Sequence, residues 1–406
     1  MKKLLLFVSI LTMAACAEEK TPQLALGEWR GEMIVSDTDT LPFNFVVDQN
    51  DNGDIDITLK NAEEKIVVDE IIVKNDSLII QMPVFEGYIA GRFGEFGIEG
   101  QFIKESLDRY VPFRAVHGEA SRFKLNDEAN YDVSGIWETT FDFDSDAPYP
   151  AKGIFYQTGS RLKGTFRTKT GDYRYLEGVV DGDSLKLSAF DGAHVFLFTA
   201  KVNDSTMQGT FFSGNHSVEH FTARRNAAFE LPDASSLTFL KEGYERFEFE
   251  FPDVSGKLVS LEDERFEDKV VLVQIMGTWC PNCLDETTFY VDYLKNNPNP
   301  QLEIVALAFE YAKTREKAFE GIERLKNRVG IEYPVLLAQV GTSSKSKANE
   351  KLPMLNHVLS YPTTVYIDKK GEVRKIHTGF NGPATGEKHE AFKTEFRSTL
   401  DELLAE

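Results

Sequence analysis

The amino-acid sequence predicts a multidomain protein: duplicated all-β domains, each an antiparallel barrel or sandwich, followed by an α/β domain. Three observations support this fold class. The chain has 406 residues, more than one hydrophobic core usually organises. Short strands rich in β-branched and aromatic residues, separated by Gly, Asp and Asn turns, fill residues 25–225. From about residue 246, apolar strands alternate with helices.

The chain begins with an expected export signal. Lys2 and Lys3 precede an apolar stretch of about a dozen residues, too short for a bilayer, which needs roughly 20. This stretch ends in "MAAC", which resembles a bacterial lipobox and implies cleavage before Cys16 and lipid attachment to its thiol. An ordinary signal peptide with an incidental cysteine is the alternative. We therefore expect a signal peptide over 1–15 and a lipid-anchored tether over 16–24.

The net charge of the chain excludes one class of partner, nucleic acids. The formal net charge is −20, which argues against nucleic-acid binding because that activity needs a basic face. We expect an exported bacterial lipoprotein of the cell envelope, attached to a membrane through its lipid. It would lie on the periplasmic face or on the outer-membrane surface.

The β region contains an internal repeat of about 108 residues. The motif Gly-x-Trp at residue 27 recurs at residue 135, and "NDSLIIQ" recurs as "GDSLKLS". Agreement over the whole unit indicates a duplicated domain rather than a solenoid, whose period is shorter. We expect one β domain over 25–125 and a second over 126–225, each a meander of antiparallel strands that closes into a small barrel or sandwich.

Each β domain ends in a strand that carries an arginine. The opening Gly-x-Trp together with this arginine, Arg114 or Arg224, resembles lipocalin-like barrels, in which the arginine packs over the tryptophan. The resemblance implies ligand binding as one role of the β domains. A structural or partner-docking role is the alternative.

The C-terminal domain is expected over 246–406, after a connector at 226–245. "KVVLVQIMG" and "LEIVALAF" are continuous apolar runs, as expected for strands buried on both faces. Helical patterns follow both strands, and the second helix should end at Gly330. "TTVYID" and "VRKIHTG" predict a hairpin, and "KHEAFKTEFRSTLDELLAE" predicts a closing helix. The stretch 341–358 predicts a further helix near the rim of the active site.

The chain has three cysteines: Cys16, Cys280 and Cys283. If Cys16 carries lipid, one pair remains. A zinc site would need two more ligands, and the seven histidines are scattered. A disulfide across Cys-x-x-Cys closes too short a loop to stabilise a domain of this size. Redox chemistry, without a metal or a cofactor, is the leading interpretation of "GTWCPNC".

Position along the chain assigns different roles to the two cysteines. The motif follows a buried strand and opens a helix, where unpaired N–H groups and the helix dipole favour an anion. Cys280 is therefore the expected nucleophile, and Cys283, one turn later, is expected to resolve the mixed disulfide.

Trp279 would flank the site and limit access, or would only pack. Glu286, on the helical face of Cys283, would raise a thiol pKa or move its proton, a surface acid being the alternative.

Three segments resemble the thioredoxin superfamily, and more closely its membrane-tethered TlpA/ResA-like thiol–disulfide oxidoreductases. "FPDVSGKLVSLED" is similar to the first extended hairpin of that family, "VVLVQIMGTWCPNC" to its active site and "YPTTVYIDKKGEV" to its cis-proline loop. The resemblance covers about 246–406 and implies a thioredoxin-like fold. It implies that Pro362 is the cis-proline facing the cysteines and that the backbone of Tyr361 pairs with substrate. Gln274 departs from thioredoxins, which keep a buried acid there, so that proton transfer should use Glu286 or water.

We therefore expect a lipid-anchored thiol–disulfide oxidoreductase that reduces disulfides of cell-envelope proteins. Electrons would come from a thioredoxin-like protein or a membrane donor, since the chain has no flavin or nicotinamide fingerprint. A peroxiredoxin is one alternative, but its Pro-x-x-x-Thr-x-x-Cys pattern is missing from "QIMGTWC". The other is a non-enzymatic binding lipoprotein with an inert docking module, which the intact Cys-x-x-Cys and Pro362 disfavour.

Overall fold

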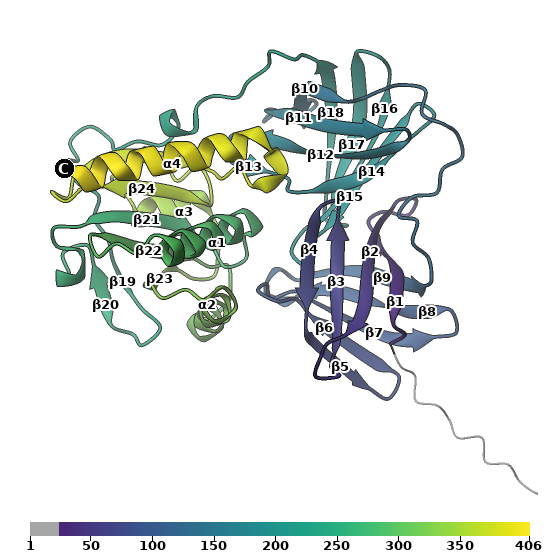
Figure 1. Cartoon of the computed structure of the whole chain (residues 1–406), viewed down its shortest axis with the longest axis horizontal. Coiled ribbons are helices and arrows are strands. Elements are labelled where there is room, and N and C mark those ends of the chain that lie inside the picture. The colour runs from purple at the N-terminus through teal and green to yellow at the C-terminus, as the bar shows by residue number, and fades with distance from the viewer. Residues whose placement is uncertain (1–23) are drawn as a thin grey trace, which may run out of the picture.

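A computed structural model describes residues 24–406, which form two β domains followed by an α/β domain (Figure 1). The expected signal peptide and Cys16 lie outside the described residues. Within residues 24–406, no helix has the length and apolar character needed to cross a membrane.

The first β domain is one nine-stranded antiparallel sheet in the order β4-β3-β2-β1-β9-β8-β7-β6-β5. Consecutive strands pair except for β4 and β5, and β9 also pairs with β1, so the sheet is a meander whose free edges are β4 and β5. Its strands are β1 (Gly27–Ile34), β2 (Thr40–Gln49), β3 (Ile55–Asn61), β4 (Glu64–Val68), β5 (Glu70–Lys74), β6 (Ser77–Gln81), β7 (Tyr88–Gly94), β8 (Gly97–Lys104) and β9 (Arg109–His117).

The second β domain repeats this meander and closes, because β11 also pairs with β12. Aromatic rings fill its interior, among them Phe141, Phe166, Phe198 and Phe221, so side chains occupy the space that a lipocalin-like ligand would need. Its strands are β10 (Gly135–Phe141), β11 (Tyr149–Thr158), β12 (Arg161–Thr168), β13 (Gly171–Asp172), β14 (Leu176–Asp181), β15 (Ser184–Phe190), β16 (Val195–Val202), β17 (Thr206–Ser213) and β18 (Ser217–Arg225).

The tryptophan that opens each β domain has the same environment in both. The Nε1–H of Trp29 donates to the carbonyl of Ala25 at 2.8 Å, and that of Trp137 donates to Val133 at 2.8 Å. Both acceptors lie four residues upstream of the ring. This matched hydrogen bond shows that the sequence repeat is also a structural repeat.

The expectation that Arg114 and Arg224 pack over these tryptophans is wrong. In the second β domain it is Arg225 that lies over the ring, 4.6 Å from its centre, and in the first it is His117 that contacts the ring. Side chains alternate across a strand, so a shift of one or three residues places an arginine on the opposite face. Arg114 and Arg224 are exposed there and form ion pairs with glutamates.

The α/β domain is built on a five-stranded sheet in the order β23-β22-β21-β24-β25, with β24 antiparallel to β21. All seven residues of β21 are buried, as its continuous apolar sequence predicts. The five strands of this sheet are β21 (Val270–Met276), β22 (Leu302–Phe309), β23 (Val335–Gln339), β24 (Thr363–Ile367) and β25 (Val373–Thr378). A separate two-stranded sheet consists of β19 (Glu250–Pro252) and β20 (Leu258–Ser260). The helices are α1 (Pro281–Asn296), α2 (Arg315–Val329), α3 (Lys345–Lys351) and α4 (Glu387–Ala405). The predicted fold class is confirmed.

The residues at its two ends define α2. The Thr314 side chain accepts the N–H of Lys317 and caps the start of the helix. Gly330 ends the helix with φ at +80°, a left-handed conformation that glycine adopts without strain.

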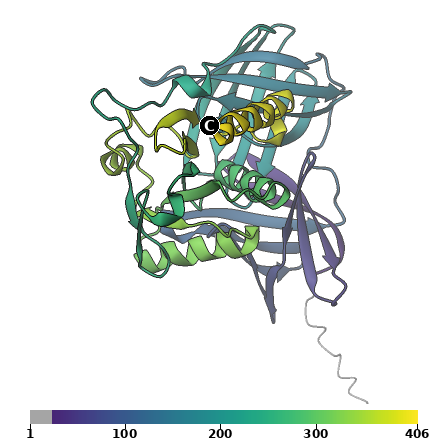
Figure 2. The same cartoon turned by 60° about the vertical axis from the view of Figure 1, so that its left-hand side comes forward.

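The three domains pack against one another, as both views show (Figures 1 and 2). Phe190 of the second β domain inserts into the first, with its ring centre 4.7 Å from that of Phe43. Helix α2 reaches the free edge of the first sheet, where Arg324 binds Glu70 at 2.6 Å. The α/β domain therefore contacts both β domains.

Candidate functional site

Cys280 and Cys283 lie where β21 ends and α1 begins. Cys280 is the N-cap residue, and its Sγ accepts the N–H of Cys283 at 3.2 Å. Pro281 occupies the first helical position, where no N–H is required. This hydrogen bond and the helix dipole favour negative charge on the Cys280 sulfur.

The two thiols differ in exposure. Cys280 exposes 7% of its surface, whereas Cys283 exposes none. Both are free thiols in this structure. Burial raises the pKa of Cys283 well above its usual range, and the adjoining Cys280 and the charge of Glu286 raise it further. A disulfide from outside can therefore reach Cys280, and Cys283 needs a proton acceptor before it can act.

Glu286 is fully buried on the same face of α1 as Cys283, so it is not a surface acid. Its Oε2 accepts hydrogen bonds from Gln274 at 2.9 Å and from Thr364 at 3.1 Å. Its Oε1 has no partner among the described residues. Burial raises the pKa of Glu286 to about 7. Near neutral pH this carboxyl group can therefore take up or release a proton beside Cys283.

Gln274 holds this carboxyl group in place. Its Nε2 donates to Glu286, while its Oε1 accepts the hydroxyl of Thr287 at 3.1 Å. Both sides of the Gln274 amide are thus engaged. The strand supplies a neutral orienting group, and the ionisable group lies on the helix.

Trp279, Tyr361 and Pro362 form the rim around Cys280. The Trp279 Nε1–H donates to the carbonyl of Phe309 at 2.9 Å, and its ring meets that of Tyr361 edge-on at 5.5 Å. The Tyr361–Pro362 peptide bond is cis. The Cys280 thiol donates to the carbonyl of Tyr361 at 3.4 Å. The predicted site residues of the α/β domain thus lie together at one end of the sheet.

Sequence reasoning missed Glu310, which follows β22 directly. Its carboxyl group accepts both the N–H and the hydroxyl of Thr278 at 2.8 Å and so fixes the loop before Trp279. Burial raises the pKa of Glu310 to about 7. An acidic residue at the carboxyl end of a buried strand beside the active-site strand was the signal that could have identified it.

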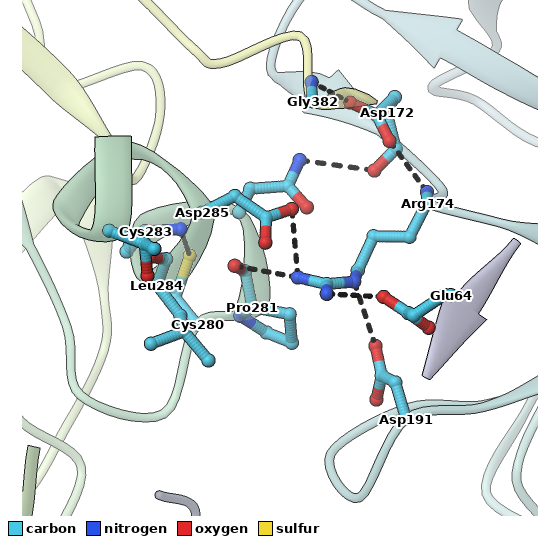
Figure 3. Close-up of polar contacts among 12 residues, drawn as sticks. Glu64, Asp172, Arg174, Asp191, Cys280, Pro281, Cys283, Leu284, Asp285 and Gly382 are labelled. Atoms are coloured by element: carbon cyan, nitrogen blue, oxygen red, sulfur yellow. Dashed lines mark hydrogen bonds and ion pairs between the residues drawn. The ribbon is translucent and has the colours of Figure 1, made fainter. Parts of the chain in front are cut away.

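Sequence reasoning also missed Arg174, on the loop between β13 and β14 (Figure 3). Its Nη1 donates to the carbonyl of Pro281, between the two cysteines, at 2.9 Å, and lies 2.9 Å from Asp285. Its Nη2 binds Glu64 at 2.5 Å, and its Nε lies 3.5 Å from Asp191. No local pattern signals this contact, because Arg174 and Pro281 are 107 residues apart.

These residues form a charge cluster, Arg174 with Glu64, Asp191 and Asp285, in which one guanidinium faces three carboxyl groups. Glu64 comes from the first β domain, Asp191 from the second and Asp285 from α1. Burial raises the pKa of Asp285 to about 7, although Arg174 opposes the shift. One buried positive charge therefore joins all three domains at the first turn of the active-site helix.

The β12–β13 hairpin lies against the same turn. Asn282 donates to the carbonyl of Asp172 at 3.0 Å, and Ser360 donates to that of Thr170 at 2.7 Å. Gly171 has φ at +136°, a conformation that favours glycine, and a Cβ there would lie 2.3 Å from the Nδ2 of Asn282. A cleft of about 620 Å³ opens on Cys280 between the hairpin and the α/β domain. Within the predicted insert, α3 begins at Lys345, which also lines this cleft.

The C-terminal part of the chain is similar to known proteins. The Redoxin family matches residues 230–393. The thioredoxin-like protein YneN of Bacillus subtilis is 28% identical over 140 residues, which are 34% of this chain and 73% of YneN. The thiol-disulfide oxidoreductase ResA of Geobacillus kaustophilus is 28% identical over 132 residues, which are 32% of this chain and 66% of ResA.

Solved structures match over the same share of the chain. A thiol-disulfide oxidoreductase from Bacteroides fragilis is 18% identical with a TM-score of 0.27, covering 37% of this chain and 99% of that one. A thiol-disulfide isomerase from Corynebacterium glutamicum is 16% identical with a TM-score of 0.28, covering 34% of this chain and 89% of that one.

Proposed function

We propose that this protein, a thiol–disulfide oxidoreductase of the thioredoxin type with a Redoxin domain over 230–393, is a membrane-tethered reductase of disulfides in cell-envelope proteins. The Trp-Cys-Pro-Asn-Cys motif supplies its redox pair. The observation that carries the proposal is the asymmetry of this pair: Cys280 caps α1 and lines the cleft with 7% of its surface exposed, whereas Cys283 is fully buried beside Glu286. The tether rests on the lipobox and Cys16 in the sequence.

The proposed reaction has two exchange steps. The Cys280 thiolate attacks one sulfur of the substrate disulfide, and the other substrate sulfur leaves as a thiolate. Cys283 gives its proton to Glu286 and attacks the sulfur of Cys280, which releases the second substrate thiolate. The substrate gains two electrons, and the enzyme ends with a Cys280–Cys283 disulfide. A thioredoxin-like protein or a membrane donor then restores the dithiol.

The buried thiol supports the proposed direction of the reaction. A dithiol becomes a strong oxidant when its reduced form is stabilised. Here burial and the Glu286 charge both disfavour the thiolate of Cys283, so this thiol adds little stability to the reduced pair, and only the N-cap position of Cys280 acts in the oxidising direction. The pair should therefore give up electrons readily, and the test is its redox equilibrium with glutathione, argued in the Discussion.

Replacing Glu286 by glutamine should stabilise the protein above neutral pH. The pKa of Glu286 rises from its usual 4.5 to about 7 on folding. The folded state then binds the proton more tightly, so the free energy of unfolding falls as pH rises between these values and stays low above pH 7. At about 1.4 kcal/mol per pKa unit, ionisation of the buried Glu286 lowers the free energy of unfolding at pH 8 by an amount on the order of 3 kcal/mol.

Urea unfolding at pH 5 and at pH 8 measures this cost. Wild type and Glu286→Gln should differ by less than about 1 kcal/mol at pH 5, and the variant should be more stable by about 2–3 kcal/mol at pH 8. Its release of bound substrate thiol should slow by at least about a hundredfold, because glutamine accepts no proton. Glu323→Gln, on the exposed surface of α2, is the matched control and should change neither quantity. Equal stabilities at both pH values would contradict the assignment.

A further inference from the structure

We infer that the second β domain forms one wall of the substrate site, and that this wall selects extended chain segments with an aliphatic or aromatic residue next to the reacting cysteine. The inference rests on the proposed function, because it concerns how a disulfide reaches Cys280. It assigns to the duplicated β region a part in choosing the substrate.

Cys280 is reached through a cleft between two domains. Its exposed part faces the cleft of about 620 Å³, which Trp279 and Tyr361 line on the α/β side. Tyr149 and His194 line it from the second β domain. The substrate sulfur must approach Cys280 to bonding distance. Its chain therefore occupies this cleft and meets the β-domain wall as well as the rim.

The wall on the side of the second β domain consists mainly of ring surfaces. The Tyr149 hydroxyl is already bonded to Tyr173 at 2.9 Å and to Glu219 at 2.6 Å, so its polar atom is satisfied within the domain. The ring of His194 stacks on Phe196 with centres 4.2 Å apart, and its Nδ1 lies 3.0 Å from the buried Asp191 carboxylate. These rings offer large apolar contact areas with little loss of side-chain entropy. A substrate side chain that lies on them should be aliphatic or aromatic.

The size of the cleft and the attachment of its wall limit what can enter. A cleft of about 620 Å³ lies within the range that holds a small ligand or a few residues of chain, far less than a folded domain. The β12–β13 hairpin is held to the α/β domain through Thr170 with Ser360 and through the Asp172 carboxylate, which accepts the N–H of Gly382 at 2.6 Å. The cleft therefore admits a disulfide on an extended segment.

Two peptides of equal length test this selection. One has leucine and phenylalanine beside its cysteine, the other has serine and glycine, and each is prepared as a mixed disulfide with thionitrobenzoate. The Cys280 thiolate bonds to the peptide sulfur and thionitrobenzoate leaves with the electron pair, which gives an absorbance signal. Cys283 then displaces the peptide thiolate. Wild type should react about tenfold faster with the apolar peptide, as burial of one such side chain predicts.

Variants of the wall show which residues produce the preference for the apolar peptide. Tyr149→Ala should reduce it to within about twofold, whereas Tyr149→Phe should keep it, because the hydroxyl faces Tyr173 and Glu219. His194→Ala, which should also weaken the preference, provides a second variant if Tyr149→Ala folds poorly. Tyr156→Ala, a half-exposed tyrosine on the same strand outside the cleft lining, is the matched control. Tyr156→Ala should also react with glutathione disulfide at the wild-type rate.

The outcomes separate the two proposals. The inference is overturned if the apolar preference survives in both Tyr149→Ala and His194→Ala. It is also overturned if wild type shows no preference between the two peptides. Failure of the wild-type dithiol to react with any of these disulfides would instead overturn the proposed function.

Discussion

Cys283→Ser should convert this protein from a catalyst into a trap that holds its substrate in a disulfide with Cys280. The first exchange step needs only Cys280, which reaches the cleft. The second step needs a thiol on the buried side of the pair, and serine supplies none. Turnover should fall by at least about a thousandfold, and an adduct of one substrate per chain should accumulate. Non-reducing electrophoresis and intact mass measure both.

Cys280→Ser provides the matched comparison. It removes the accessible sulfur and leaves Cys283, which is fully buried, as the sole thiol of the motif. This variant should lose turnover to the same extent but form no adduct. Adducts of equal yield from the two serine variants would contradict the division of roles between the thiols.

Arg174→Met should loosen the contact among the three domains. The change removes the positive charge that faces three carboxyl groups, and only Asp191 keeps a second basic partner among the described residues, His194 at 3.0 Å. The Glu64, Asp191 and Asp285 side chains expose 9%, 4% and 20%. Removing one partner of a buried pair costs about 3–5 kcal/mol. The loss should be smaller at pH 5 than at pH 8, since burial already raises the pKa of Asp285 to about 7 and protonation relieves the repulsion.

Urea unfolding and limited proteolysis of the connector measure this effect. Arg161→Met is the control, because Arg161 is exposed in the same domain and forms no ion pair among the described residues; its stability should change by less than about 0.5 kcal/mol. Adding Asp285→Asn to Arg174→Met should recover part of the loss, as expected for contacting groups. A loss below about 1 kcal/mol, independent of pH, would show that the cluster does not hold the domains together.

Local signals in the sequence were enough for the fold class and the cysteine pair. A buried strand that runs directly into Cys-x-x-Cys predicts a cysteine at a helix start, and Cys280 is the N-cap of α1. Gly330 marks the end of α2 for a similarly local reason, its left-handed φ. The repeat was detectable because both copies keep their opening tryptophan in the same hydrogen bond.

Features that depend on packing between distant segments were not predictable. Trp137 pairs with Arg225, which therefore lies over its ring; a register shifted by one residue would have placed Arg224 there instead. Glu286 and its neighbour Asp285 are both acids of the same helix. One is buried against the sheet and the other against a different domain. Neither environment has a sequence signal within the helix.

The redox equilibrium of Cys280–Cys283 with glutathione tests the central claim most directly. The raised pKa of the buried Cys283 and the acid beside it predict a reducing pair. We expect a potential near or below about −250 mV, close to that of thioredoxin, and mass loss of two hydrogens on oxidation. A potential between about −120 and −180 mV would place the pair with oxidants and isomerases and would contradict the assignment of this protein as a reductase.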